Sequence, residues 1–260
     1  MRVRPPAVAG LFYPDDPAEL AALVDQLLGA ARAGEAPPKA VIAPHAGYVY
    51  SGPIAASAYA TVRPLRDVVS RVVLLGPAHR WPVRGIALSA ADAFATPLGM
   101  VAVDGDARSR VLGLPGVEVE DRAHAREHSL EVHLPFLQRT LAAFRILPLL
   151  VGEAEPAHVA DVLDRVWGGP ETLIVVSSDL SHYQDAVTAR AWDRRTAEAI
   201  VACELERIGP DDACGCHPLR GLLAAVRRRA LAVRLLDLRN SGDTAGPDDA
   251  VVGYGAFAVA

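Results

Sequence analysis

Two apolar runs in the first third of the sequence end in the same way, and this repetition most constrains what the chain can fold into. Ala40–Ala43 is followed by Pro44-His45, and Arg71–Leu75 is followed by Gly76-Pro77-Ala78-His79. Continuous apolar runs are typical of strands buried on both faces of a parallel sheet, and a proline just beyond such a run ends the strand. Both segments therefore predict a buried strand with an imidazole just past its carboxyl end.

A third run of the same kind lies much later in the chain. Leu173–Val176 leads into Ser177-Ser178-Asp179, and His182 follows shortly after. In open α/β sheets, ligands bind in the crevice outside the carboxyl ends of the strands. We therefore expect Asp179 and His182 to lie at the same edge of the sheet as the two earlier imidazoles.

The rest of the sequence alternates between helical and strand patterns. Asp16-Pro17 is a typical helix start, with a capping side chain and a proline in the first turn. Helical spacing predicts further helices over Pro53–Val62, Asp106–Leu112, Leu134–Phe144, Ala157–Val166, Thr188–Leu205 and Pro218–Arg229. Apolar runs predict further strands over Ile86–Leu88, Val101–Val103, Ile146–Val151, Leu231–Leu236 and Val251–Val259. This alternation predicts a single domain over 1–260, a three-layer α/β/α sandwich with a mostly parallel central sheet.

Composition excludes several classes of protein. A net charge of -5 gives no electrostatic case for binding nucleic acid or an anionic membrane. No apolar stretch approaches the roughly 20 residues of a membrane span, and the N-terminal segment is a poor signal peptide. The three cysteines, Cys203, Cys214 and Cys216, do not make a disulfide framework. We therefore expect a protein of the reducing cytoplasm.

His45 and His79 are the leading candidates for metal ligands, because neutral imidazole is a common metal donor. Either residue alone would be better explained as a loop histidine hydrogen-bonded to the backbone. Their matched positions after two parallel strands favour a shared ion. The residues alone leave the third ligand open among Cys214, Cys216, Asp179, His182, His217, Glu127 and His128.

The segment Glu127-His128-Ser129-Leu130-Glu131-Val132-His133 resembles a zinc-protease motif only superficially. That motif places two histidines four residues apart on one helical face, whereas here they are five apart, or about 140° around a helix. We expect His128 in the strand-end pocket, and His133 either there or as a capping or packing residue. His124 and His158 are expected at the surface.

Asp179 and His182 are candidates for general acid–base catalysis or for orienting metal ligands. The alternative for Asp179 is a cap on the helix that follows. Glycine-rich phosphate loops of the GxGxxG and Walker types are absent, and so is a GxSxG nucleophile elbow.

Five segments, in order and rough spacing, resemble the MEMO family. They are Ala43-Pro44-His45-Ala46-Gly47-Tyr48, Gly76-Pro77-Ala78-His79, Glu127–Pro135, Ser177-Ser178-Asp179-Leu180-Ser181-His182 and Cys214-Gly215-Cys216-His217-Pro218. The N-terminal Ala9–Pro14 and the C-terminal Gly253-Tyr254 fit as well, so the resemblance covers essentially the whole chain.

The resemblance implies a fold shared with class III extradiol (LigB-type) dioxygenases, which bind ferrous iron through two histidines and a glutamate. By position, His45 and His79 would be the imidazole ligands, and His182 would be the acid–base histidine. The third ligand of the MEMO family is a cysteine, which corresponds here to Cys214. Cys216 falls at the variable position of the Cys-Gly-X-His-Pro pattern and would not be a ligand.

The same resemblance implies a metal-binding protein, with Fe(II) expected and copper or zinc as alternatives, since a thiolate is a softer donor than a carboxylate. One hypothesis is a dioxygenase-like, metal-dependent oxidoreductase in which His182 moves a proton while Asp179 and His128 line the pocket. It would act on a small molecule or peptide, alongside the AMMECR1-domain and radical SAM proteins of the AmmeMemoRadiSam system, in which such chains are called protein B. The alternative is a non-catalytic metal- or peptide-binding module with a vestigial pocket. A fold does not decide between them, so the site must.

Overall fold

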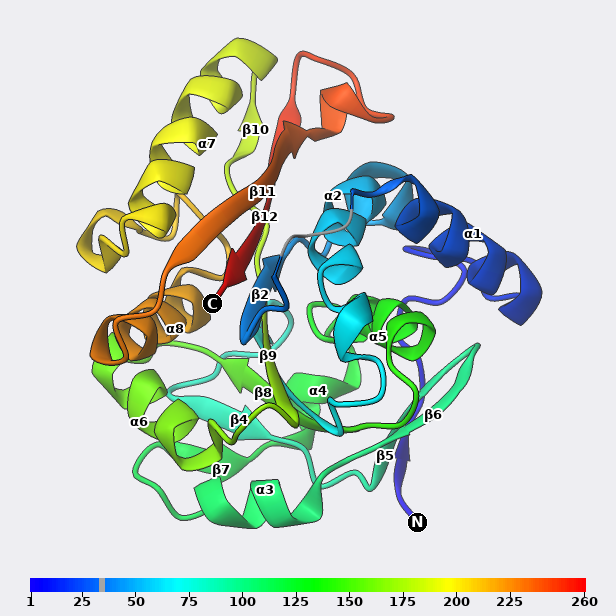
Figure 1. The fold of residues 1–260 in the computed structure, drawn as a ribbon, viewed down its shortest axis with the longest axis vertical. Coiled ribbons are helices and arrows are strands. Elements are labelled where there is room, and N and C mark those ends of the chain that lie inside the picture. The colour runs from blue at the N-terminus through cyan, green and yellow to red at the C-terminus, as the bar shows by residue number, and fades with distance from the viewer. Residues whose placement is uncertain (33–35) are drawn as a thin grey trace.

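Four parallel strands form the centre of the main sheet. In a computed structural model, which describes residues 1–32 and 36–260, they lie in the order β2 (Ala40–Ala43), β9 (Thr172–Ser177), β3 (Arg71–Pro77) and β8 (Arg145–Val151). The three buried runs that precede His45, His79 and Asp179 are therefore adjacent strands of one sheet, as predicted. Figure 1 shows them in the middle of the molecule.

Antiparallel pairs extend this sheet on both sides. β12 (Val251–Val259) pairs with β2, and both β11 (Val233–Asn240) and β10 (His182–Gln184) pair with β12. On the other side, β4 (Ile86–Leu88) is antiparallel to β8, and β7 (Val117–Val119) runs parallel to β4. The four central strands are therefore parallel, and the residues that follow their carboxyl ends lie at one edge of the sheet.

A small second sheet contains β1 (Val3–Arg4), β5 (Ala93–Thr96) and β6 (Gly99–Ala102). A turn over residues 96–99 precedes the strand predicted at Val101–Val103, but the other predicted strand, Ile86–Leu88, does not lead into it. That strand joins the main sheet, and the hairpin partner is β5. Two of the four residues in Ala-Phe-Ala-Thr are alanines, which are depleted in strands, and pairing with β1 on one side and β6 on the other stabilises this strand.

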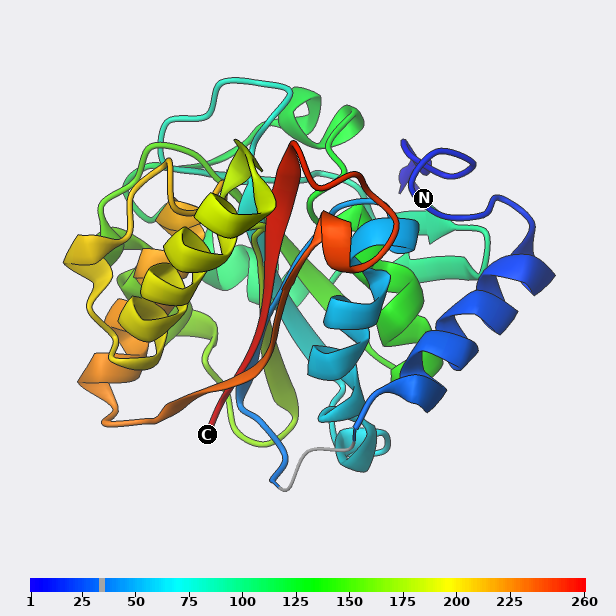
Figure 2. The ribbon, with the colours of Figure 1, turned by 90° about the horizontal axis from the view of Figure 1, so that it is seen from above.

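Helices cover both faces of the main sheet (Figures 1 and 2). One face is covered by α1 (Pro17–Ala30), α2 (Tyr48–Ala60) and α5 (Leu134–Thr140). The other is covered by α3 (Gly105–Val111), α6 (Pro156–Val166), α7 (Ala186–Val201) and α8 (Cys216–Arg228). The shorter helices are α4 (Asp121–Ala125), η1 (Arg63–Leu65), η2 (Glu131–His133), η3 (Leu205–Arg207) and η4 (Ser241–Asp243).

Alternate residues of each central strand enter two separate apolar cores. In β3, Val72 and Leu74 pack under α2, whereas Val73 and Leu75 pack under α6 and α8. This follows from the two-residue period of side chains along a strand. The three-layer α/β/α fold predicted from the sequence is confirmed. No helix of the described residues is long and apolar enough to cross a bilayer.

Three predicted helix boundaries are wrong. α2 begins at Tyr48, before the predicted start at Pro53, and Pro53 lies inside it. Pro53 is the sixth residue of α2, so its missing N–H leaves the Val49 carbonyl without an intrahelical donor. The tertiary packing of Tyr48, whose hydroxyl donates to the Val132 carbonyl, stabilises the earlier start in spite of this cost. The helix predicted to reach Phe144 ends at Thr140, and the one predicted to reach Leu205 ends at Val201.

Candidate metal centre

The strand ends bring three imidazoles together. His45 lies just after β2 and His79 just after β3, and β9 separates these two strands in the sheet. His128 reaches the same place from the segment between α4 and η2. One ring nitrogen from each of the three lies within 4.8 Å of the other two, and this is the group of described residues that could hold a metal ion.

The three rings pack directly against one another. The centroid of His45 lies 5.1 Å from that of His79 and 5.3 Å from that of His128, both edge-on. His79 and His128 are stacked, with centroids 4.8 Å apart. Three neighbouring imidazoles cannot all be protonated at modest cost. Burial, followed by the positive charges of the other histidines, holds the pKa of His45 well below its usual value.

Hydrogen bonds fix the tautomer of His45. Its Nδ1 lies 2.6 Å from Ser177 Oγ, and that hydroxyl donates its one hydrogen to the Ser129 carbonyl, 2.6 Å away. Ser177 must therefore accept from His45 Nδ1–H. The proton of the neutral ring sits on Nδ1, and Nε2 presents a lone pair to the cluster.

A carboxylate fixes the tautomer of His79. Glu127 Oε1 lies 3.0 Å from His79 Nδ1, and an ionised carboxylate can only accept. His79 therefore carries its proton on Nδ1 and presents Nε2. An imidazole that donates its other N–H to a carboxylate or hydroxyl is the usual arrangement of a metal-ligating histidine.

Glu127 also accepts hydrogen bonds from the backbone around the cluster. Its Oε1 accepts from the backbone N–H of His128 and of Ser129, both at 2.9 Å, and its Oε2 accepts from the backbone N–H of His79 at 2.5 Å. Burial acts to raise the pKa of Glu127, but the His128 and His79 side chains and the Ser129 N–H outweigh it and hold that pKa far below its usual range. The residue is a permanent anion beneath the three rings.

His128 is held less firmly than the other two. Its Nδ1 lies 3.2 Å from Glu127 Oε1 but makes no well-aligned hydrogen bond. Stacking on His79 and contact with the Phe12 ring, at 4.8 Å between centroids, position it instead. It is the imidazole that also lines the open pocket beside the cluster.

Cys214 reaches the cluster from the loop before α8. Its Sγ lies 3.3 Å from His45 Nε2 and accepts from the Asp179 N–H at 3.3 Å. Burial, and then the negative charge of Asp179, raise the pKa of this thiol far above its usual value. A sulfur and a nitrogen that bind one ion, with bonds of about 2.3 Å and 2.1 Å, lie roughly 3.1–3.6 Å apart. The 3.3 Å between Cys214 Sγ and His45 Nε2 therefore fits coordination of the same ion.

The other members of the Cys214–Pro218 segment lie apart from the cluster. Cys216, the first residue of α8, is buried in the apolar core. His217 Nδ1 lies 3.3 Å from the Ala154 carbonyl. Neither residue belongs to the group of imidazoles that could hold an ion.

Asp179 contacts the cluster and does not cap a helix. Its Oδ1 accepts from the backbone N–H of His45 at 2.7 Å, and its Oδ2 lies 3.9 Å from His45 Nε2. Asp185, not Asp179, caps the following helix α7. Burial raises the pKa of Asp179, and the His45 N–H and the nearby histidines act against that rise. The carboxyl group therefore holds a proton more readily than an exposed aspartate does.

A pocket of about 410 Å³ opens beside the cluster, lined by His128, Asp179 and His182. Its walls are largely apolar and aromatic, formed by Leu11, Phe12, Tyr50, Tyr183, Val252 and Tyr254 among others. Tyr183 has a φ of 60°, which is rare for a residue with a side chain, and such strain is often found at functional sites. The pocket suits a small ligand with an apolar body and a polar end.

The remaining histidines have other roles. His124 is buried, not at the surface as predicted, and its Nε2 lies 3.0 Å from the Ala87 carbonyl. His158 is half-buried on α6. His133 packs in the core with its Nδ1 2.9 Å from the Tyr59 hydroxyl, which agrees with the packing alternative. The sequence did not single out the orienting roles of Glu127, Ser177 and Ser129, because nothing in their spacing signals which ring nitrogen they contact.

Comparisons with known proteins find similar chains that match over nearly the whole length. The family model described as Memo-like protein matches residues 4–258. A MEMO1 family protein of Aquifex aeolicus is 39% identical over 270 residues, which cover 98% of each chain. MEMO1 family proteins of Methanosarcina barkeri and Methanopyrus kandleri are 38% and 35% identical, covering 99% and 98% of this chain and 100% and 98% of theirs.

Proposed function

The chain belongs to the Memo family, and we propose that it binds ferrous iron through His45, His79 and Cys214 at the carboxyl edge of its sheet. The orientation of the two imidazoles carries this proposal. Ser177 and Glu127 take the Nδ1 protons of His45 and His79, so both Nε2 lone pairs are presented to the same space before any ion arrives. This orientation supports a cation site that is organised before the ion binds.

The dimensions of the cluster support a single ion. Bonds of about 2.1 Å to nitrogen place two ligands of one ion at most about 4.2 Å apart. The ring nitrogens of His45, His79 and His128 lie within 4.8 Å of one another, a group that does not include Cys214, so small side-chain movements suffice to bring the His45 and His79 nitrogens to one ion. Cys214 is the third ligand in this proposal because its sulfur already lies at a coordinating separation from His45 Nε2. A metal also supplies the positive charge that this thiol needs to lose its proton.

His128 is the alternative third ligand, since it completes the three-imidazole group. The absorption spectrum of the bound metal distinguishes Cys214 from His128 as the third ligand. A thiolate ligand gives an intense sulfur-to-metal charge-transfer band with Co(II) or Cu(II), which a Cys214→Ser variant loses and a His128→Gln variant keeps. Metal binding without such a band in the parent, lost in His128→Gln and kept in Cys214→Ser, would assign the third position to His128.

We further propose that the protein is a dioxygenase-like oxidoreductase. Ferrous iron supplies the one-electron chemistry with dioxygen that amino-acid side chains lack. In the pocket, the aromatic wall binds the body of a phenolic substrate, while His182, aided by Asp179, accepts the proton of its hydroxyl group. The chemical match between an acid–base pair, an aromatic wall and an adjoining cation site supports this assignment. The association with AMMECR1-domain and radical SAM proteins stays a prediction.

Oxygen uptake tests the catalytic part. Protein reconstituted anaerobically with ferrous iron is mixed with air-saturated buffer and a panel of catechols, and oxygen consumption is followed with an electrode. We expect uptake with at least one catechol, and a loss of roughly a hundredfold in His182→Ala with iron still bound. Stoichiometric iron without uptake on any catechol would contradict turnover of this substrate class and favour the binding module.

Glu127→Gln is expected to weaken metal binding by roughly 10–100-fold. The amide that replaces the carboxylate has one acceptor oxygen, which cannot serve His79 Nδ1–H and three backbone N–H groups together. His79 then loses its fixed tautomer. Competition with a metal chelator of known affinity measures the change, and the exposed Glu118→Gln is the matched control. Equal affinities for both variants would exclude an orienting role for Glu127.

A further inference from the structure

The pocket beside the histidine cluster opens through a group of exposed apolar side chains. Among the large apolar residues that the structure describes beyond the first residue of the chain, the four most exposed are Leu11 at 80%, Tyr183 at 77%, Val187 at 76% and Val49 at 63%. Leu11 and Tyr183 line the pocket, together with Tyr50. We call these five residues the apolar rim. Single exposed apolar residues are ordinary, but a group of them around one opening indicates a binding surface.

One side of the apolar rim is held by a backbone hydrogen bond. The Tyr48 N–H donates to the Phe12 carbonyl at 2.8 Å, which fixes the segment that carries Leu11 against the start of α2. Val49 and Tyr50 lie in the first turn of that helix. The backbone beneath these side chains is therefore already ordered, and a ligand that covers them restricts only side-chain freedom.

The other side of the apolar rim continues from the proposed acid–base histidine. His182 and Tyr183 are neighbours in β10, their ring centroids lie 5.7 Å apart, and both residues line the pocket. Val187 follows in the first turn of α7, where the Ala186 N–H donates to the Asp248 carbonyl at 2.9 Å. A ligand whose polar end lies at His182 therefore leaves the pocket across the apolar rim.

The charges around the pocket favour a ligand whose outer part is uncharged. None of the described residues that line the pocket is a lysine or an arginine, and these are the usual partners of phosphate and carboxylate groups. Asp185, Asp248 and Asp249 are exposed beside the rim and add negative charge. The same charge disfavours an anionic membrane as the occupant of the rim.

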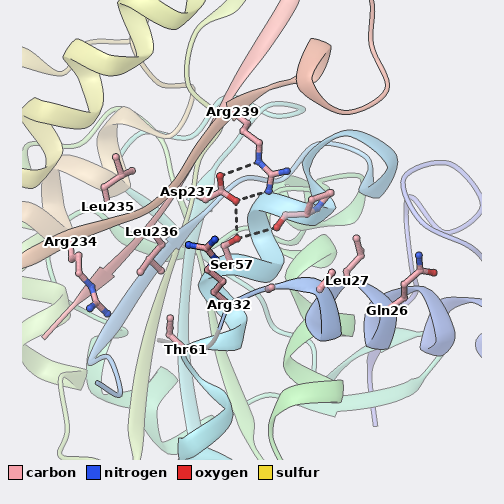
Figure 3. Close-up of a pocket in the computed structure, with 13 residues that line it drawn as sticks. Gln26, Leu27, Arg32, Ser57, Thr61, Arg234, Leu235, Leu236, Asp237 and Arg239 are labelled. Atoms are coloured by element: carbon pink, nitrogen blue, oxygen red, sulfur yellow. Dashed lines mark hydrogen bonds and ion pairs between the residues drawn. The ribbon is translucent and has the colours of Figure 1, made fainter. Parts of the chain in front are cut away.

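A larger pocket, of about 770 Å³, lies between α1, α2 and β11 and differs in character (Figure 3). Asp237 accepts there from Arg239 Nε at 3.0 Å and from Ser57 Oγ at 2.8 Å. A ligand that replaced these hydrogen bonds would leave polar groups unpaired, which costs free energy. The polar groups of that pocket therefore satisfy one another, whereas the side chains of the apolar rim face solvent.

We propose that the ligand of the pocket beside the cluster is a phenol that carries an uncharged alkyl tail. The phenolic ring lies against the aromatic wall with its hydroxyl group at His182, and the tail crosses Leu11 and Tyr183 at the mouth. A volume of about 410 Å³ suits such a ligand better than a bare ring, because pockets of about 300–1,000 Å³ bury most of a drug-sized molecule. This inference rests on the proposed function and names the substrate class of the same pocket.

Calorimetric titration of the metal-free full-length protein with alkylphenols, from methylphenol to hexylphenol, tests this inference without iron or oxygen. A methylene group that becomes fully buried is worth about fourfold in affinity, and one that is half covered on a surface is worth about twofold. Hexylphenol should therefore bind about thirtyfold more tightly than methylphenol, since each added methylene group multiplies the affinity.

Leu11→Ser/Val49→Ser removes the apolar side chains from one side of the rim. The ratio of hexylphenol to methylphenol affinity should fall to about fivefold or less in this variant. The matched control Met100→Ser/Val119→Ser changes two exposed apolar residues of β6 and β7 that do not line the pocket. It should keep the ratio near about thirtyfold, and circular dichroism melts establish that both variants are folded.

Three results would overturn the proposal. They are a parent ratio below about threefold, an equal fall of the ratio in both double variants, and tighter binding of a phenol whose tail of equal length ends in a carboxylate. A parent ratio below this limit, with dimers in the parent and monomers in Leu11→Ser/Val49→Ser by sedimentation, would assign the rim to a second copy of the chain.

The outcome is separate from that of the oxygen-uptake experiment. A strong dependence on tail length without oxygen uptake on any catechol would support the tail site and contradict the proposed turnover. Uptake on catechols without any dependence on tail length would support turnover and overturn the tail site.

Discussion

His45→Ala/His79→Ala is expected to reduce bound iron from near one equivalent to less than about a tenth of an equivalent after anaerobic reconstitution and gel filtration. The two rings supply the lone pairs that Ser177 and Glu127 direct into the cluster. Without them, a protonated thiol and one loosely held imidazole remain, which are too few donors for a divalent ion. Metal content is measured by inductively coupled plasma mass spectrometry.

The matched control is His158→Ala, which removes a half-buried imidazole from α6 on the other face of the sheet. It should retain the full equivalent of iron. A double variant that keeps stoichiometric iron while folded would contradict the site, because no other group of described residues offers three such ligands. If His158→Ala also lost its bound iron, the loss would not be specific to His45 and His79.

Glu131→Gln is expected to lower the free energy of unfolding by about 3–5 kcal/mol. Glu131 is fully buried, forms an ion pair with Arg4, and accepts from the backbone N–H groups of Ala7 and Val8 and from the Tyr13 hydroxyl. A neutral amide leaves the buried guanidinium of Arg4 without its counter-charge. This network attaches the N-terminal segment, including Phe12 beside His128, to the body of the protein.

Urea unfolding followed by circular dichroism measures this change, with the exposed Glu118→Gln expected within about 0.5 kcal/mol of the parent. An Arg4→Met/Glu131→Gln double variant should lose less than the sum of the two single changes, because the double change leaves no unpaired charge. A loss below about 1 kcal/mol in Glu131→Gln would show that the buried pair is not what holds the segment.

Those parts of the fold that depend on local pattern were predictable from the sequence. Ala40–Ala43, Arg71–Leu75 and Leu173–Val176 read as buried strands because both faces of each are apolar, and they are adjacent in the central sheet. Asp16 was recognisable as a cap, and it accepts from the N–H groups of Ala18 and Glu19. β5 was not recognisable, since its strand conformation depends on partners distant in sequence.

The position of the candidate site was predictable from the sequence, but the hydrogen bonds between its residues were not. The matched positions of His45 and His79 indicated that the two rings meet, because the carboxyl ends of parallel strands lie at one edge of the sheet. The position of β9 between their strands was not predicted from the sequence. Whether Asp179 would cap a helix or contact His45 depends on which N–H its oxygen meets, and only the folded chain decides that. The burial of His124 was missed for the same reason, since its acceptor, the Ala87 carbonyl, lies on β4.

Anomalous diffraction at the iron edge from crystals grown anaerobically with ferrous iron tests the central claim most directly. The account predicts a single strong peak about 2.0–2.3 Å from His45 Nε2 and His79 Nε2, with Cys214 Sγ within about 2.5 Å. A peak coordinated elsewhere, or Nδ1 rather than Nε2 of either ring facing the iron, would contradict it.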